Sequence, residues 1–318
     1  MLYPLLLKAP IKEKIWGGSR LKTEFNFDTE TDYAGEAWLL SCNTEGESIV
    51  KNGEYAGYTL GEVLEKWGEK AIGSKANFSD FFPIMIKLID AKDRLSVKVN
   101  PDDTYAKINE GSLGKTEMWY IVDCESDAKI IYGIKKNITR DELRHRIKIG
   151  TLSEICNFVP VKKGDVFHIE PNMIHAMGKG MLVASVMQNN DITYRISDYG
   201  RLDFSGKSRT LHIDKAVECA NISPTVNTSE SGEITLFPFG IVKNLDTCDK
   251  FVSDLLELNG KAGLLEKDSF LAVTLISGEV VLSYPTGNMR MFKGDCVFVP
   301  ANCRITLCGT ATVLTAHL

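Results

Sequence analysis

The chain has 318 residues, of which 44% are hydrophobic, and this is enough to bury one large core or two modest ones. Its 37 Lys and Arg residues stand against 42 Asp and Glu residues, a formal net charge of −5. This mildly acidic balance argues against nucleic acid as a partner, because nucleic-acid-binding proteins usually carry a basic surface. A small anionic ligand needs only a local cluster of cations and remains compatible with the composition.

The eight cysteines are scattered without any C-x-x-C pair, which favours reduced thiols over a disulfide framework. The opening residues, M-L-Y-P-L-L-L-K, form too short an apolar run for a secretory signal, and Pro4 interrupts it. The sequence contains no apolar run long enough to cross a bilayer. We therefore expect a cytoplasmic protein with no membrane partner.

The N-terminal part of the chain predicts strands first and then a helix. Short apolar runs broken by Gly, Asn and Asp over residues 1–55 are typical of early strands and turns. From Thr59 to Gly73 the spacing becomes helical, with Thr59 as the expected N-cap and Glu62 completing a capping box. The apolar run at residues 82–91 then predicts a buried strand.

Two strands in the middle of the chain carry the most informative residues. R-L-S-V-K-V-N-P-D-D occupies residues 94–103, and G-S-L-G-K-T-E occupies 111–117 and leads into M-W-Y-I-V. The first stretch alternates as in a strand with one apolar and one polar face, through Leu95, Ser96, Val97, Lys98, Val99 and Asn100. N-P-D-D then predicts a turn. We therefore expect Lys98, Asn100 and Glu117 to converge on one concave surface.

A second helical pattern occupies residues 137–157 and predicts a helical insertion between strands. Thr139 and Glu142 form another potential capping box. The expected buried stripe of this helix consists of Ile138, Leu143, Ile147 and Ile155. His145 is expected in solvent on the same helix, and residues 211–220 predict a short helix farther along.

The C-terminal part of the chain contains an internal repeat. K-G-D-C-V-F-V-P-A-N at residues 293–302 echoes K-G-D-V-F-H-I-E-P-N at 163–172, which indicates a duplicated β unit. In the second copy Ile305 stands where the first has His175, and no acid matches Glu117. The second unit is therefore expected to be structural, without a site.

Short strands with Gly and Pro turns predict jelly-roll geometry in both units. The polar segment at residues 223–233 contains Pro, Ser and Gly and is the expected linker. We therefore predict a mainly β protein with two cupin-like units. A site-bearing unit with a helical insertion covers residues 1–222, and a small degenerate β unit covers residues 223–318.

Several of these motifs resemble the type I mannose-6-phosphate isomerases, which are zinc enzymes on a cupin scaffold. The resemblance is carried by G-K-T-E, by L-S-V-x-V-x-P-D-D and by H-A-x-G. It extends to I-W-G-G at 15–18, G-E-A-W-L-L-S at 35–41, F-P-I-M-I-K-L-I-D-A at 82–91 and T-Y-R-I-S-D-Y-G-R at 193–201. The resemblance implies interconversion of mannose 6-phosphate and fructose 6-phosphate, with a sugar phosphate as partner. The sequence leaves the oligomeric state open.

The resemblance also implies a zinc site, but the chain departs from the family's pattern there. The family supplies a Gln and a His on the first strand, the Glu of K-T-E and the His of H-A-x-G. Glu117 and His175 match, whereas Lys98 replaces the Gln and Asn100 replaces the His, which leaves Asn100 as an amide candidate ligand. Because a protonated Lys98 has no lone pair and repels a dication, we expect weak or absent zinc and a Lys98–Glu117 ion pair. His168 is either a substitute ligand or a coincidence.

The phosphate contacts implied by the resemblance are better preserved. Ser96, Arg195 and Arg201 occupy positions that resemble the family's phosphate contacts, and Lys98 joins them as a substrate-binding residue. Arginine suits this task because its planar guanidinium binds a phosphate through two hydrogen bonds.

The catalytic residues that the resemblance implies are Lys115 and Arg195, which would assist proton transfer and charge stabilisation. The family also has an acid ten residues before the arginine of Y-R, but Ser185 stands there. Each assignment has a structural alternative. Lys115 is otherwise a surface cation, His175 a satisfied core histidine, and Arg195 part of an ion pair with Asp198 or Asp191.

Two classes of function therefore remain open at this point. The first is a mannose-6-phosphate isomerase. The second is a catalytically weakened or inactive relative that binds a sugar phosphate or another small anion. Zinc content and a rate assay with mannose 6-phosphate discriminate between them.

Overall fold

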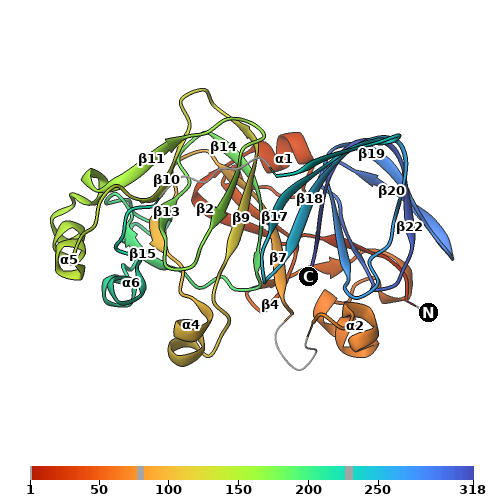
Figure 1. Cartoon of the computed structure of the whole chain (residues 1–318), viewed down its shortest axis with the longest axis horizontal. Coiled ribbons are helices and arrows are strands. Elements are labelled where there is room, and N and C mark those ends of the chain that lie inside the picture. The colour runs from red at the N-terminus through yellow and green to blue at the C-terminus, as the bar shows by residue number, and fades with distance from the viewer. Residues whose placement is uncertain (1, 77–81, 226–231) are drawn as a thin grey trace.

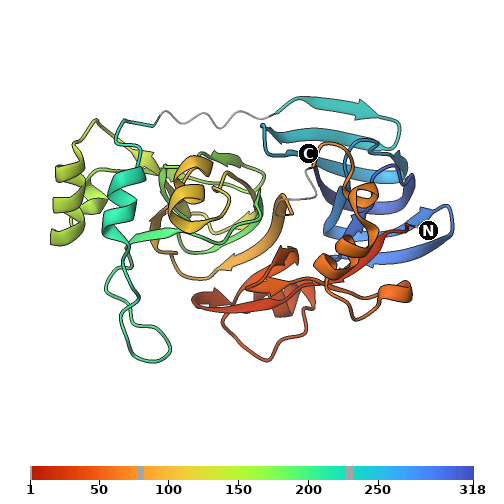
Figure 2. The ribbon, with the colours of Figure 1, turned by 90° about the horizontal axis from the view of Figure 1, so that it is seen from below.

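The computed structural model describes residues 2–76, 82–225 and 232–318, and these form two β-rich lobes that lie side by side (Figure 1). Seen from below, the N-terminal strands lie along one side of the two lobes (Figure 2). The predicted mainly β architecture is confirmed. Within the described ranges every α-helix ends before residue 220, as expected for helices confined to the first unit. No helix in these ranges is long and apolar enough to span a membrane.

Two sheets enclose the interior of the first lobe. The six-stranded sheet has the order β12-β9-β14-β7-β2-β3 and is built from β2 (Ile11–Gly18), β3 (Ala34–Leu40), β7 (Ile84–Ala91), β9 (Glu117–Cys124), β12 (Val166–Ile169) and β14 (Met181–Gln188). The five-stranded sheet has the order β11-β10-β13-β8-β15 and is built from β8 (Val97–Val99), β10 (Lys129–Ile134), β11 (Cys156–Pro160), β13 (Ile174–Ala176) and β15 (Tyr194–Ser197). The short strands β4 (Cys42–Asn43) and β5 (Gly46–Glu47) pair with each other.

A nine-stranded sheet forms the second lobe, and two N-terminal strands join it. Its strands are β1 (Leu5–Lys8), β6 (Ile49–Val50), β16 (Ile234–Phe237), β17 (Gly240–Thr247), β18 (Val252–Leu264), β19 (Leu271–Tyr284), β20 (Gly287–Phe292), β21 (Cys296–Val299) and β22 (Ile305–His317). Leu5 pairs with Phe298, and Leu7 pairs with both Cys296 and Val50. The sheet therefore cuts across the expected boundary at residue 222. Local sequence patterns cannot indicate such long-range strand pairing.

The helices begin mostly where the sequence predicts and end where glycine or turn geometry stops them. They are α1 (Arg20–Phe25), α2 (Leu60–Trp67), α3 (Glu69–Ile72), α4 (Asp103–Glu110), α5 (Arg140–Ile149) and α6 (Ile213–Cys219), with 3-10 turns at Gly53–Tyr55 and Leu152–Glu154. The predicted capping box is present, with Thr59 Oγ1 accepting from the Glu62 amide and Glu62 Oε2 accepting from the Thr59 amide. The single helix expected here is split into α2 and α3 because Gly68 adopts φ 67°.

Two helices, α1 and α4, were not expected, and α5 is shorter than its pattern suggested. Asp102, assigned to a turn, also caps α4, because its Oδ1 accepts from the Tyr105 amide. Only Ala106 of α4 is buried, so this helix lacks the apolar stripe that would have indicated it. α5 ends at Gly150 in the left-handed conformation, and the predicted stripe is buried as expected.

Four large apolar clusters hold together the described parts of the two lobes, and a small fifth one consists of Trp38, Met85 and Met187. Trp119 and Phe167 belong to the cluster between the two sheets of the first lobe, whereas Val97 belongs to the one that joins the outer face of the five-stranded sheet to α5 and α6. Phe298 belongs to a third cluster, which contacts both lobes and includes the N-terminal strands. The fourth fills the interior of the second lobe. The first-lobe interior differs from the others because polar side chains enter it at one end.

The internal repeat is matched by equivalent backbone geometry. Gly164 and Gly294 have φ of 89° and 93°, and Asn172 and Asn302 have φ of 68° and 60°. Asp165 accepts from the Lys162 amide at 2.9 Å, as Asp295 accepts from the Phe292 amide at 2.8 Å. These paired features support the predicted duplication.

The second copy replaces polar groups of the first by apolar ones. Ile169 pairs with Glu117 in the first lobe, and the equivalent pair in the second is Val299 with Leu271. Leu271 and Ile305 are buried in the apolar interior of the second lobe. An apolar interior agrees with the expectation that this copy is structural.

An ion pair connects the lobes at β12 and β17. His168 Nδ1 lies 2.6 Å from Asp246 Oδ2. This hydrogen bond raises the pKa of His168, with burial opposing it and Asp246, Glu170 and Asp249 adding favourable negative charge. The protonated imidazole therefore contributes more to the junction than the neutral one.

We predict that this junction is more stabilising in acid than in base. A histidine with a raised pKa in the folded state contributes stability that is complete below its ordinary pKa of about 6.5 and is lost as pH rises through the raised value. Asp246→Asn should therefore lower the free energy of unfolding more at pH below about 6 than at pH above about 8. Urea unfolding at both pH values measures the difference. In a His168→Gln background the pH dependence of the Asp246→Asn effect should disappear; its persistence would show that another group is responsible.

Candidate functional site

A charged cavity opens between the two sheets of the first lobe. Six cationic side chains line it, namely Lys14, Lys87, Lys98, Lys115, Arg195 and Arg209. Three carboxylates line it as well, namely Glu36, Glu117 and Asp191. The cavity holds about 120 Å³, less than the ~300–1,000 Å³ of typical ligand sites. Long cationic side chains thus occupy part of the space, and the excess of positive charge suits an anionic ligand.

Three adjacent strands place a row of polar residues on one face of the five-stranded sheet, and two of them line the cavity. Lys98 on β8 pairs in register with His175 on β13 and with Arg195 on β15. Neighbours in register on adjacent strands point to the same face of a sheet. Val97 and Val99 point to the opposite face and pack in the apolar cluster there. The expected alternation is therefore present from Ser96 to Asn100. Leu95 departs from it, because it lines the cavity and packs in the interior cluster with Trp119.

Glu117 faces this row from the other sheet and is almost completely buried. Its Oε1 accepts a hydrogen bond from Asn100 Nδ2 at 2.7 Å, and its Oε2 accepts one from Trp119 Nε1 at 2.8 Å. Burial alone would raise the pKa of Glu117, but the positive charges of Lys98 and Lys115 lower it to about 2. The carboxylate is therefore ionised inside the protein.

Two nitrogen bases, Lys115 and His175, lie near this carboxylate, and both have a lowered pKa. Burial lowers the pKa of Lys115 to about 8, against the opposing negative charge of Glu117. Burial also lowers the pKa of His175 to about 4. His175 Nδ1 lies 2.9 Å from the Met173 carbonyl oxygen, which fixes the proton on Nδ1. Among the described residues His175 Nε2 has no partner, and it lies 4.0 Å from Glu117 Oε1.

Sequence reasoning missed a buried ion-pair network beside these groups. Lys87 Nζ lies 2.6 Å from Asp191 Oδ1 and 3.3 Å from Glu36 Oε2, and it sits over the ring of Trp38. Burial alone would lower the pKa of Lys87, but Asp191 and Glu36 raise it above its usual range. The available signal was Lys87 itself, a charge in the middle of an otherwise apolar run.

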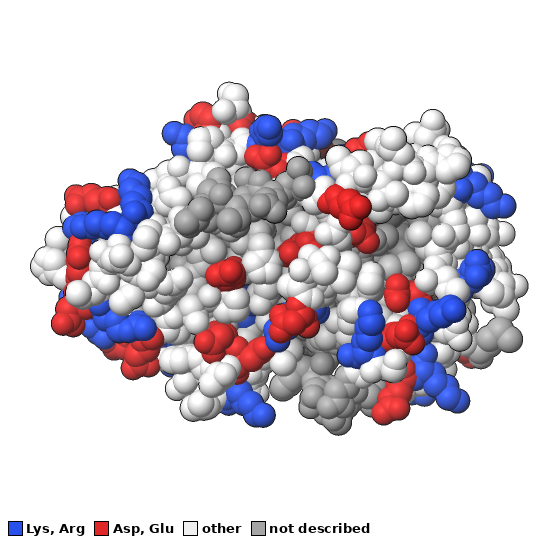
Figure 3. All heavy atoms as spheres, viewed as in Figure 1, with Lys and Arg blue, Asp and Glu red and all other residues white. Residues whose placement is uncertain are grey.

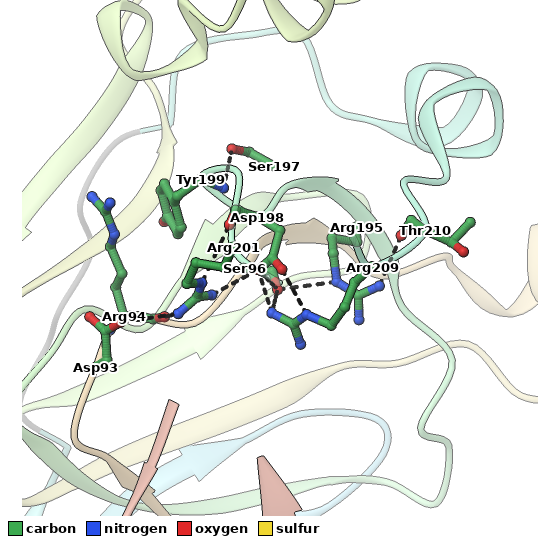
Figure 4. Close-up of polar contacts among 10 residues, drawn as sticks. All are labelled: Asp93, Arg94, Ser96, Arg195, Ser197, Asp198, Tyr199, Arg201, Arg209 and Thr210. Carbon is green, nitrogen blue, oxygen red and sulfur yellow. Dashed lines mark hydrogen bonds and ion pairs between the residues drawn. The ribbon is translucent and has the colours of Figure 1, made fainter. Parts of the chain in front are cut away.

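At the rim of the cavity a single carboxylate gathers two arginines (Figure 4). Asp198 accepts from Arg201 Nη2 at 2.8 Å and from Arg209 Nε at 2.7 Å, and Arg209 Nη2 also bonds Asp198 Oδ1. Ser96 Oγ donates to Asp198 and accepts from Arg195 Nε at 3.1 Å and Arg209 Nη2 at 2.9 Å. Ser96, Arg195 and Arg209 thus converge at one point.

The structure does not bring Arg201 to the cavity lining. Its guanidinium binds Asp198, the Arg94 carbonyl oxygen and Asp93 (Figure 4). Arg209, which the sequence analysis did not single out, lies at the cavity instead. A loop arginine eleven residues from its partner Asp198 carries no periodic signal that would have identified it. Arg195 makes no ion pair within 4.0 Å of Asp198 or Asp191; its Nη1 donates to the Thr210 carbonyl oxygen at 2.9 Å.

The structure decides the alternative left open for His168 and contradicts the expected Lys98–Glu117 ion pair. His168 lies on the face of its sheet opposite to Glu117, because His168 pairs with Met118 while Ile169 pairs with Glu117, and it binds Asp246. It therefore cannot substitute as a ligand in the cavity. No ion pair within 4.0 Å forms between Lys98 and Glu117, both of which are described, because the Asn100 amide occupies Glu117 Oε1.

The residues present do not fit a tight zinc site. Zinc sites in proteins normally use three or four His, Cys or carboxylate ligands. In the described part of the chain no group of three or more His, Cys, Asp and Glu could hold a metal. His175 Nε2 and Glu117 Oε1 offer two donors, whereas Asn100 directs its N–H group to the carboxylate and its carbonyl oxygen accepts from Thr193. The ammonium of Lys98 opposes a dication.

Ser185 is buried on β14, opposite Lys87 and Trp119 in neighbouring strands. Among the described residues its hydroxyl oxygen has no hydrogen-bond partner. Ser185 therefore lies inside the first lobe, at the position where the family pattern has an acid, and its hydroxyl makes no hydrogen bond to a described residue.

The concentration of positive charge in the cavity contrasts with the mixed charge on one outer face of the molecule. On the face seen in Figure 3, lysine and arginine side chains are interspersed with aspartate and glutamate. An anion is therefore attracted to the cavity by a local cluster rather than by the charge of this face.

Comparisons with known proteins agree on one family. Residues 5–123 match the type I phosphomannose isomerase catalytic domain, and residues 241–318 match the mannose-6-phosphate isomerase cupin domain. The putative mannose-6-phosphate isomerase YvyI of Bacillus subtilis is 38% identical over 99% of both chains. Mannose-6-phosphate isomerase ManA of the same organism is 37% identical over 99% of both. A crystal structure of the Bacillus subtilis mannose 6-phosphate isomerase superimposes with a TM-score of 0.93 at 36% identity, covering both chains completely.

We predict that Asp198 is essential to the stability of the arginine cluster. Removing one partner of a buried ion pair leaves uncompensated charge and typically costs about 3–5 kcal/mol. Asp198→Asn should therefore lower the free energy of unfolding in urea by about 3 kcal/mol. Asp127→Asn is the matched control, because Asp127 and Lys179 form an exposed pair 3.7 Å apart and such pairs contribute about 0–1 kcal/mol. Equal losses in the two variants would contradict this role for Asp198.

Proposed function

Because the chain belongs to the type I mannose-6-phosphate isomerase family, we propose that it interconverts mannose 6-phosphate and fructose 6-phosphate in the cavity described above. The observation that carries this proposal is the pairing of two kinds of site in one cavity. An arginine and serine cluster lies at its rim, and Glu117, Lys115 and Lys98 lie inside. A sugar phosphate matches this arrangement, because its phosphate fits the cluster at the rim and its sugar carbons reach the groups inside.

The phosphate is assigned to Ser96, Arg195 and Arg209. The guanidinium groups of Arg195 and Arg209 both lie within hydrogen-bond distance of Ser96 Oγ and offer several N–H donors to a tetrahedral anion. The Ser96 hydroxyl donates to Asp198 in the free protein and would turn to the anion when it binds. Arg201 has a positioning role in this proposal, because it holds Asp198, which in turn holds Arg209. The phosphate group would anchor the substrate and orient the sugar toward Lys115.

The reaction at the sugar end moves hydrogen between adjacent carbons. The hydrogen on C2 of the open-chain aldose moves to C1 and the proton on O2 moves to O1, so that no oxidant or co-reactant is needed. A group that accepts and returns a proton and a cation that stabilises the negative oxygen accelerate such a transfer. Lys115 and Arg195 are assigned to these tasks because both line the cavity.

Zinc is a property of the family in general, and we propose that this chain binds it weakly or not at all. Glu117 and His175 are two donors where at least three are usual. Asn100 donates to Glu117 and cannot offer the same strength as an imidazole.

A second function is favoured by one observation. Lys98, Asn100 and Ser185 stand at positions where the family pattern has a metal ligand or an acid. A protein that kept the phosphate cluster and lost the reaction would bind a sugar phosphate without turning it over. An isomerase assay decides between the two functions.

We predict that purified protein converts mannose 6-phosphate to fructose 6-phosphate in a coupled assay. Arg209→Met should raise KM by about tenfold or more, because it removes a charged donor from the phosphate. Arg201→Met, the matched arginine outside the cavity, should raise KM less. Absence of turnover together with measurable binding of mannose 6-phosphate would favour the binding function. A larger effect of Arg201→Met would return the phosphate contact to Arg201.

Metal content provides a separate test. Elemental analysis of protein purified without added metal should find zinc well below one ion per chain. The triple variant Lys98→Gln/Asn100→His/Ser185→Glu should gain zinc and turn over faster, because it supplies an imidazole, removes the opposing charge and restores a carboxylate. Near-stoichiometric zinc in the wild type, at a turnover equal to that of the triple variant, would contradict the proposed weak site.

A further inference from the structure

The cationic side chains of the cavity differ in whether a protein carboxylate pairs with them. Lys87 is held by Asp191 and Glu36, and Arg209 is held by Asp198. Within the described residues, Lys98 makes no ion pair and no side-chain hydrogen bond. An ammonium that lines a cavity without a protein partner is free to bind a ligand.

Lys98 lies between the phosphate cluster and Glu117, where the sugar end of a bound sugar phosphate would lie. It is the middle member of the row formed with His175 and Arg195, and its side chain is half-buried. Glu117 faces it from the opposite sheet, and the phosphate cluster begins at Ser96, two residues earlier on the same face. A ligand whose phosphate is held at this cluster and which extends toward Glu117 therefore lies beside Lys98.

Glu117 does not need Lys98 as a hydrogen-bond donor. Both carboxylate oxygens already accept hydrogen bonds, from Asn100 and from Trp119. Lys98 influences Glu117 through space at more than 4.0 Å. Its three N–H donors therefore remain available to a bound oxygen atom.

We propose that the ammonium group of Lys98 takes the place of a metal ion at the sugar end of the cavity. It donates a hydrogen bond to the carbonyl oxygen of the open-chain sugar phosphate, O1 of the aldose or O2 of the ketose. It also stabilises the negative charge that develops on this oxygen during hydrogen transfer. This inference rests on the proposed isomerase function. Binding and turnover then proceed without a divalent metal.

The inference separates the two ends of the ligand. Inorganic phosphate needs only Ser96, Arg195 and Arg209, whereas mannose 6-phosphate also contacts Lys98. Loss of the Lys98 charge should therefore weaken binding of the sugar phosphate and leave binding of phosphate nearly unchanged.

The experiment is calorimetric titration of mannose 6-phosphate and of inorganic phosphate into chelator-treated protein, with and without added zinc. The wild type should bind mannose 6-phosphate equally well in both conditions. Lys98→Met should weaken this binding by about tenfold or more and change phosphate binding by less than about twofold. Lys98→Gln, which is neutral and polar, should give the same result and controls for a packing defect. Lys107→Met, an exposed lysine on α4, should behave as the wild type.

A rate assay on the same proteins completes the test. Wild-type turnover should survive the chelator, and Lys98→Met should lose kcat as well as affinity. The proposal is overturned if the wild type needs zinc to bind mannose 6-phosphate, or if both Lys98 variants bind it as the wild type does. It is also overturned if these variants lose phosphate and sugar phosphate equally, since Lys98 would then be a phosphate contact. Failure of the wild type to bind either ligand in any condition would instead refute the proposed function and, with it, this inference.

Discussion

The site depends on one requirement, which is to keep the carboxylate of Glu117 ionised inside a protein core. A buried carboxylate is costly unless hydrogen bonds and positive charge surround it. Asn100 and Trp119 supply the hydrogen bonds, while Lys98 and Lys115 supply the charge. Because two lysines share one carboxylate, the inner end of the cavity retains positive charge. This surplus makes the cavity suitable for an anionic substrate.

A second carboxylate, Asp198, performs the complementary task at the rim. It binds Arg201 and Arg209 and receives the hydroxyl of Ser96. Arginines held close together repel one another, so a carboxylate between them lowers the cost of their assembly. Part of the charge of Arg195 remains uncompensated, since no carboxylate lies within 4.0 Å of it among the described residues. The two ends of the cavity are therefore built on the same principle, a buried acid outnumbered by bases.

The duplicated architecture explains why the charged cavity lies in the first lobe. The two copies share glycine and asparagine conformations and aspartate turns. The interior of the second is apolar, with Leu271 and Ile305 in place of Glu117 and His175. An apolar interior stabilises a lobe by burial without a need for balanced charge. Strand β1 and the ion pair of His168 with Asp246 then connect this lobe to the one that carries the cavity.

The sequence by itself determined several of the elements and the family. Alternation predicted the polar face of β8, capping residues predicted α2 and α5, and the motifs predicted the isomerase resemblance that full-length comparisons confirmed. Only the tertiary structure decided the neighbours of each charge. It placed Arg209 rather than Arg201 at the cavity, turned His168 to the opposite face and gave Glu117 an amide partner instead of Lys98. The physical reason is the separation along the chain over which each interaction acts. Periodicity and capping act over a few residues, whereas a buried charge selects its partners across sheets and loops that sequence spacing does not bring together.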